Sequence, residues 1–134
     1  MISTRKAPEK KALPTAVEYC QAFAATLHVV TVVPGFGMSF VGLYFPEDFK
    51  DKALAKADED LGGFVGEHVP SGVKNRHSIG YGSVYEEILR ICVESKCDLI
   101  VMASQRPELK DYLLGPNAAR VVRHARCSVL VVRG

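Results

Sequence analysis

The residues that can bind a metal or attack a substrate are scattered along the chain. The four cysteines include no C-x-x-C pair, and none lies at zinc-ligand spacing from a histidine. We interpret Cys20, Cys92 and Cys127 as small core residues, because they lie in apolar stretches. Cys97 directly precedes an expected strand and is the thiol to test for reactivity. The sequence therefore predicts no metal site.

The histidines likewise form no catalytic pattern. None of them shares a recognisable triad spacing with a serine, a cysteine or an aspartate. The four are His28, His68, His77 and His124. The chain also has no Walker-type G-x-x-x-x-G-K-[ST] loop. We therefore expect no catalytic residues.

One glycine has the position of an anion-binding residue. Gly115 directly precedes an expected helix, where backbone N–H groups and the helix dipole favour a negative charge. Asn117 and the alanines after it would supply N–H donors, whereas Pro116 has no N–H and removes one. The same Gly-Pro pair is also typical of a simple turn that binds nothing, and spacing alone favours that turn.

Alternating helical and strand patterns surround these positions. Apolar residues at helical spacing predict helices over residues 14–26, 47–68, 83–95 and 117–125. Ser83 and Glu86 have the spacing of a capping box at the start of the third helix. Runs of β-branched and apolar residues predict strands over residues 27–33, 73–79, 98–103 and 128–133.

This alternation predicts an α/β fold, with a parallel sheet flanked by helices on both faces. Sheets of this kind bind ligands beyond the carboxyl ends of their strands. We therefore expect three segments to meet at that edge. They are Val33 with Pro34, residues 103–106, and residues 115–117.

The composition is that of one globular domain. A chain of 134 residues, with 48% hydrophobic and 24% charged residues, is too apolar to be disordered. A net charge of +2 argues against nucleic-acid binding. No apolar run approaches the roughly 20 residues of a membrane span, so no membrane association is expected. The start of the chain lacks the apolar core of a signal peptide, which predicts a cytoplasmic protein.

The last 37 residues carry a recognisable signature. The segment DLIVMASQRPELKDYLLGPNAARVVRHARCSVLVVRG resembles the C-terminal part of the universal stress protein family, and in particular its short bacterial F-type branch. The resemblance implies a Rossmann-like fold, similar to the adenine nucleotide alpha hydrolases, with five parallel strands in the order 3-2-1-4-5. It also implies a homodimer formed by the final strands, through Val129, Leu130, Val131 and Val132.

The family resemblance implies a nucleotide site as well. Many members bind ATP through a G-x-x-G-x9-G-[ST] loop. In this chain Ala103 replaces the first glycine, Arg106 or Pro107 the second, and Pro116 the hydroxyl residue, while Gly115 retains the third glycine. The resemblance therefore implies ATP or a related adenine nucleotide, with or without Mg²⁺ and with at most slow hydrolysis. The expected binding residues are Val33, Pro34, Met102, Ala103, Ser104, Arg106, Gly115, Pro116 and Asn117. The three departures leave an alternative open, a dimeric interaction module of the same fold that binds no nucleotide.

The N-terminus also departs from the family pattern. Members begin with an apolar central strand that ends in an aspartate near the nucleotide, whereas this chain begins MISTRKAPEKK. Either residues 1–6 take the place of that strand, or the first strand is missing from this sequence. We expect the second.

Overall fold

The computed structural model describes residues 2–4, 12–35, 49–104 and 115–133. Arg106 and most of the segment between the first expected strand and the second helix lie outside the described residues. No helix among the described residues is long and apolar enough to cross a membrane.

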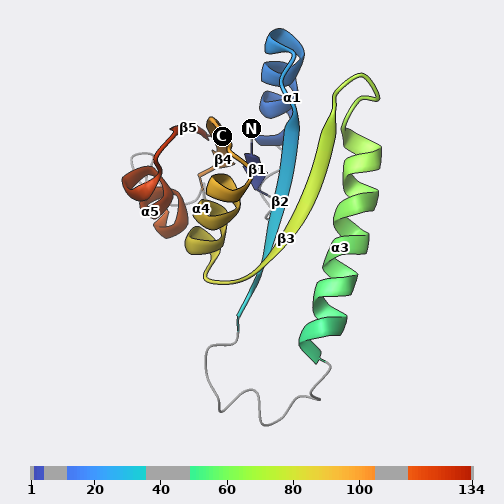
Figure 1. Ribbon diagram of the computed structural model, residues 1–134, viewed down its shortest axis with the longest axis vertical. Coiled ribbons are helices and arrows are strands. Elements are labelled where there is room, and N and C mark those ends of the chain that lie inside the picture. The colour runs from blue at the N-terminus through green and yellow to red at the C-terminus, as the bar shows by residue number, and fades with distance from the viewer. Residues whose placement is uncertain (1, 5–11, 36–48, 105–114, 134) are drawn as a thin grey trace.

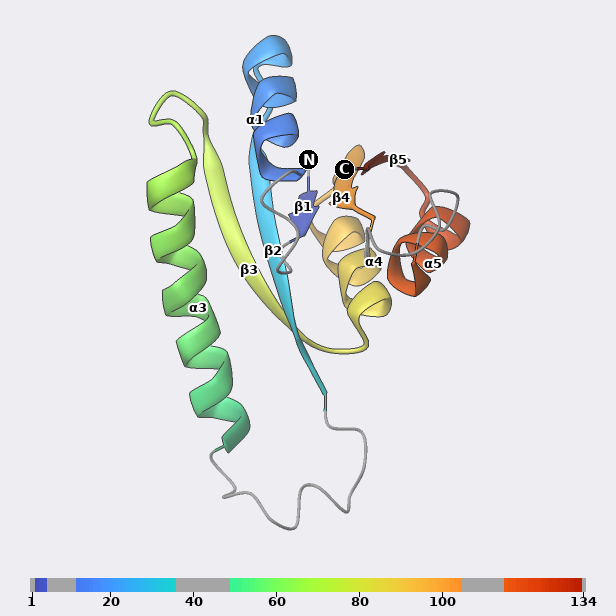
Figure 2. The same cartoon turned by 180° about the vertical axis from the view of Figure 1, so that it is seen from behind.

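Five parallel strands form a single sheet, which confirms the expected α/β fold. Their order across the sheet is β3 (Asn75–Gly82), β2 (Leu27–Pro34), β1 (Ile2–Thr4), β4 (Leu99–Ala103) and β5 (Ser128–Val132). This is the order that the family resemblance implied. The long β2 and β3 run side by side, as both Figure 1 and Figure 2 show.

The first strand is present, so the expectation that it is missing was wrong. In β1, Ile2 lies opposite His28 of β2 on one side and Ile100 of β4 on the other. Without β1, the inner edges of β2 and β4 would have buried backbone groups with no partner, which is costly. Backbone pairing needs no apolar side chain, so three residues of a polar terminus can fill this place. A three-residue strand is too short to produce a periodic pattern in the sequence.

Within the described residues, four helices cover the two faces of the sheet. The face that bears Val29 and Val101 packs against α1 (Ala12–Phe23) and α3 (Phe49–His68). The opposite face packs against α4 (Val84–Glu94) and α5 (Pro116–His124). Figures 1 and 2 both show α4 beside α5, and α3 alongside β3.

The start of α4 differs from the expected capping box. Ser83 is the N-cap residue, but its side chain makes no capping hydrogen bond. The next glutamate along, Glu87, accepts a hydrogen bond from the backbone N–H of Tyr81 at 3.0 Å. Glu87 also pairs with Arg90 at 2.7 Å, and this contact lowers the pKa of the Glu87 carboxyl. The helix is therefore tied to the end of β3 through Glu87 rather than capped by Ser83.

Candidate functional site

The start of α5 provides a set of backbone donors at the carboxyl edge of the sheet. Gly115 is the N-cap residue, with φ +84° and ψ 157°, a conformation that is essentially restricted to glycine. Its carbonyl accepts the N–H of Ala119 at 3.1 Å. The N–H groups of Gly115, Asn117 and Ala118 come before that of Ala119 in the chain, so no carbonyl of the helix accepts a hydrogen bond from them. This end of α5 also carries the positive end of the helix dipole.

Pro116 is exposed and occupies the first helical position. Proline suits that position because its φ is preset for the helix. It has no N–H, so the turn offers three donors where another residue would give four.

The end of β4 lies near this turn. Met102 packs in the same core cluster as Ala118 of α5. The side chains of Met102 and Ala103 are both buried, on opposite faces of the sheet, so they can present only backbone to a ligand. The N–H of Ser104 donates to the carbonyl of Val132 at 3.0 Å, which joins the ends of β4 and β5.

Val33 and Pro34 lie further along than the end of β4. Ile2 lies opposite both His28 and Ile100, so Ala103, three residues beyond Ile100, is level with Thr31. Pro34 is three residues beyond Thr31, which places it about 10 Å past the end of β4. The structure therefore places Met102 in one core cluster with the first turn of α5, whereas Val33 and Pro34 extend past the end of β4.

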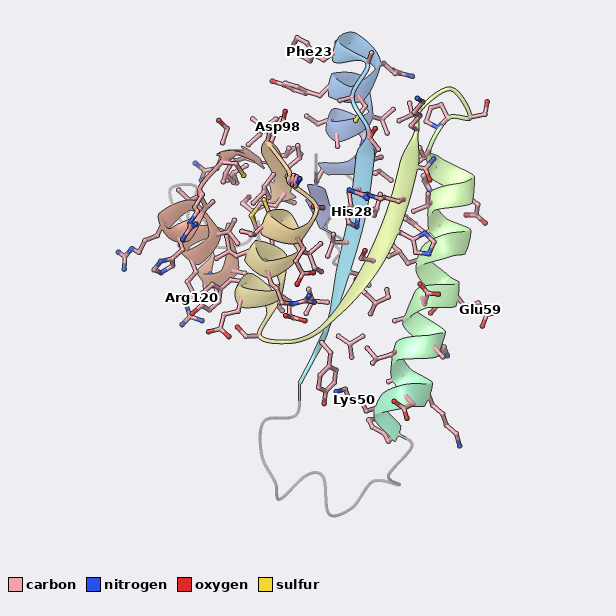
Figure 3. The ribbon with its side chains drawn as sticks, in the orientation of Figure 1. Phe23, His28, Lys50, Glu59, Asp98 and Arg120 are labelled. Carbon is pink, nitrogen blue, oxygen red and sulfur yellow. The ribbon has the colours of Figure 1, made fainter. Side chains whose placement is uncertain are left out.

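The sequence did not reveal two features at the ends of β2 and β3. The N–H of Gly35 donates to the carbonyl of Gly82 at 3.1 Å, and a Cβ on Gly35 would lie only 3.0 Å from the Gly82 Cα. The two glycines thus permit a close approach between the end of β2 and the end of β3. The ammonium of Lys50, labelled in Figure 3, lies 4.2 Å from the centre of the Tyr81 ring, which places a positive charge at this edge.

One histidine forms a partly buried pair with a serine. The Nε2 atom of His28, the second residue of β2 (Figure 3), lies 2.6 Å from the Ser78 hydroxyl oxygen of β3. The His28 Nδ1 atom is buried without a hydrogen-bond partner among the described residues, so no third group orients the ring. Burial, followed by the positive charge of Arg76, lowers the pKa of His28 to about 4. Among the described residues, the pair therefore lacks the arrangement of a catalytic triad.

The low pKa of His28 predicts a loss of stability in mild acid. The unfolded chain takes up this proton near pH 6.5, while the folded chain takes it up only near pH 4. Between these values the unfolded state binds more protons, so the free energy of unfolding decreases as the pH falls, by about 3 kcal/mol in all. Urea titrations of wild type and His28→Gln across pH 4–7 measure this contribution as the difference between their two profiles. His68→Gln, at an exposed position, is the control. If the free energy of unfolding changed with pH in the same way in wild type and in His28→Gln, this would contradict the low pKa of His28.

The structure gathers three cysteines that the sequence analysis treated separately. The sulfur atoms of Cys92, Cys97 and Cys127 all lie within 4.8 Å of one another. Burial raises the pKa of the Cys92 thiol, so this thiol is protonated rather than reactive near neutral pH. The search for C-x-x-C pairs missed this group, because four residues separate Cys92 from Cys97 and Cys127 lies much further along the chain.

Comparison with known proteins gives one consistent answer. Residues 4–133 match the sequence model of the universal stress protein family. Universal stress protein G of Salmonella typhimurium is 31% identical over 113 residues, which cover 80% of this chain and 77% of that protein. The solved structure of universal stress protein UspA from Lactobacillus plantarum aligns with a TM-score of 0.72 at 22% identity, over 98% of this chain and 96% of that one. The universal stress protein from Archaeoglobus fulgidus, solved in complex with dAMP, aligns with a TM-score of 0.69 at 17% identity, over 97% and 94%.

Proposed function

Because the chain belongs to the universal stress protein family, we propose that it is a cytoplasmic stress-response protein that binds ATP or a related adenine nucleotide. The phosphates lie at the start of α5, and the nucleotide extends along the carboxyl edge of the sheet. The observation that carries this proposal is the positive φ of Gly115 directly before a helix, which exposes backbone donors to an anion.

Two further observations support a nucleotide at this edge. The strands are all parallel, and ligands of such sheets bind beyond the carboxyl ends of the strands. The Archaeoglobus fulgidus relative with a similar fold was solved in complex with dAMP. Backbone N–H groups can hold a phosphate but cannot accept or deliver a catalytic proton. The donor set therefore suits retention of a nucleotide without rapid turnover.

The direct test is the nucleotide content of the purified protein. We expect denatured protein to release an adenine nucleotide that mass spectrometry identifies. Calorimetry on nucleotide-free protein should then show tighter binding of ATP than of adenosine, since the phosphates supply the main contacts.

The second candidate function is an interaction module that binds no nucleotide. Pro116 favours this module, because proline removes one N–H from the turn that would bind the phosphates. Protein that carries no nucleotide and gives no binding heat with ATP supports that module.

Pro116→Ser separates these two functions further. Serine restores an N–H and adds a hydroxyl at the first position of α5, and each hydrogen bond to a charged group contributes about 1.5–3 kcal/mol. We expect ATP binding to become about tenfold tighter. Pro70→Ser, in the exposed turn after α3, makes the same chemical change away from the site and should leave the affinity unchanged. Unaltered affinity in Pro116→Ser would place the phosphates elsewhere.

We also propose that the protein is a homodimer formed through β5. This strand is at one end of the sheet, and β4 is its only partner among the residues that the structure describes. Its residues Val129, Leu130, Val131 and Val132 are half-buried. An apolar end strand with an unpaired backbone edge favours pairing with a second chain.

A further inference from the structure

Three cysteines meet at the amino edge of the sheet, opposite the proposed nucleotide site. Cys92 is near the end of α4, Cys97 precedes β4, and Cys127 precedes β5. The first residues of β4 and β5, Leu99 and Ser128, lie opposite each other, so the segments that lead into the two strands arrive side by side. Figure 3 marks this end of β4 by Asp98, next to Cys97.

The turn after α4 brings Cys97 back toward Cys92. Lys96 has φ +54°, a left-handed conformation that reverses the chain. The N–H of Cys97 donates to the carbonyl of Cys92 at 3.0 Å, and the N–H of Lys96 donates to the carbonyl of Val93 at 3.2 Å. These two bonds define a Schellman motif, so the backbone holds the Cα atoms of Cys92 and Cys97 at a fixed separation.

The distances between the sulfur atoms match those of a metal-thiolate site. A Zn²⁺ ion binds each sulfur at about 2.3 Å, which holds three sulfurs about 3.8–4.0 Å apart. The Sγ atoms of Cys92 and Cys127 are 3.5 Å apart, and all three sulfurs lie within 4.8 Å. We propose that Cys92, Cys97 and Cys127 bind one thiophilic metal ion, Zn²⁺ or Cu⁺, through three thiolates, and that the ion displaces the thiol protons into solvent.

An ion can reach this site from solvent. All three cysteines line an open cleft of about 650 Å³ between α4 and the end of α5. The open side leaves a fourth position for water or a small ligand on Zn²⁺, whereas Cu⁺ is satisfied by soft thiolates.

The charge around the cleft suits such a site. Three thiolates and a divalent ion carry a net charge of −1, and Lys96 and Arg126 line the same cleft. Arg90 also lines it, but its guanidinium is bonded to Glu87 and Glu94 at 2.7 and 2.9 Å. Glu86 and Glu94 also line the cleft, so its three cations exceed its two carboxylates by one positive charge, which offsets the net charge of a zinc site with three thiolates.

A disulfide explains the arrangement less well. A bond between Cys92 and Cys127 would leave the third thiol without a role. One metal ion accounts for all three sulfurs, and it needs no oxidant.

The test is metal titration of the full chain with its thiols kept reduced. Zn²⁺ is measured in competition with a coloured chelator, and Cu⁺ is measured the same way without oxygen. Co²⁺ replaces Zn²⁺ as a spectroscopic probe, since thiolate ligands produce a charge-transfer absorption. We expect one equivalent of Zn²⁺ or Cu⁺ per chain, and the stronger competitor identifies the preferred ion.

Single variants test the ligands. Cys97→Ala and Cys127→Ala change half-buried residues, and each should weaken binding by about 100-fold or more and abolish the Co²⁺ absorption. Cys20→Ala is the matched control, since Cys20 lies in the core cluster on the other face of the sheet. It should bind as wild type does. Circular dichroism checks that each variant is folded. Absence of binding by the wild type overturns the proposal, and so does binding that survives in both folded variants.

Discussion

Gly115→Ala is expected to weaken adenine-nucleotide binding by about 100-fold or more. At φ +84° and ψ 157° an alanine is strained by about 1–3 kcal/mol, so the turn before α5 must change its conformation. The change rotates the backbone donors of Gly115 and Asn117 away from the phosphates. Loss of two hydrogen bonds to a charged group, at about 1.5–3 kcal/mol each, accounts for the expected decrease. Isothermal calorimetry with ATP measures it.

A second glycine, away from the site, serves as the control for a glycine-to-alanine substitution. A Cβ on Gly63, in α3, would meet no atom within 4 Å. Gly63→Ala should therefore retain wild-type affinity. Equal ATP affinity in Gly115→Ala and Gly63→Ala would show that the α5 turn does not hold the phosphates.

The parts of the fold with strong periodicity were predictable from the sequence. The β-branched run of β2 and the apolar run of β4 predicted these two strands. Each predicted end lies within one residue of the observed end. The central β1 was missed, because its place depends on the unpaired edges of β2 and β4 rather than on its own side chains. Ser83 occupies the expected N-cap position, yet the side-chain contacts of the capping box depend on the neighbouring β3.

The candidate site was predictable only in part, for a similar reason. Gly115 could be predicted from local sequence, because a glycine directly before a helix lets an anion reach the backbone N–H groups of the first turn. The position of Val33 and Pro34 relative to Gly115 could not be predicted, because the register between strands, which sets how far β2 extends past β4, cannot be read from one strand. The three-cysteine group could not be predicted as a whole, because only the pairing of β4 with β5 brings Cys127 to the C-x4-C pair of Cys92 and Cys97.

Val131→Pro is expected to dissociate the proposed dimer while each chain stays folded. The carbonyl of Val132 faces β4, since it accepts the N–H of Ser104. The N–H and C=O of one residue in a parallel strand point to the same side, and successive residues alternate. The backbone groups of Val131 therefore point away from β4, toward the edge where a second chain would pair. Proline removes that N–H and leaves the bonds between β4 and β5 intact.

Analytical ultracentrifugation at micromolar concentration measures the outcome. Wild type should sediment as a dimer, and Val131→Pro should show a dimer dissociation constant at least about 100-fold higher, equivalent to about 3 kcal/mol. Val131→Thr keeps the β-branched shape and the N–H, so it should remain a dimer. Circular dichroism should show that all three proteins keep their helices and strands. A proline variant that stays a dimer, or a wild type that sediments as a monomer, would remove β5 as the interface, because pairing through β5 needs the free backbone groups of Val131.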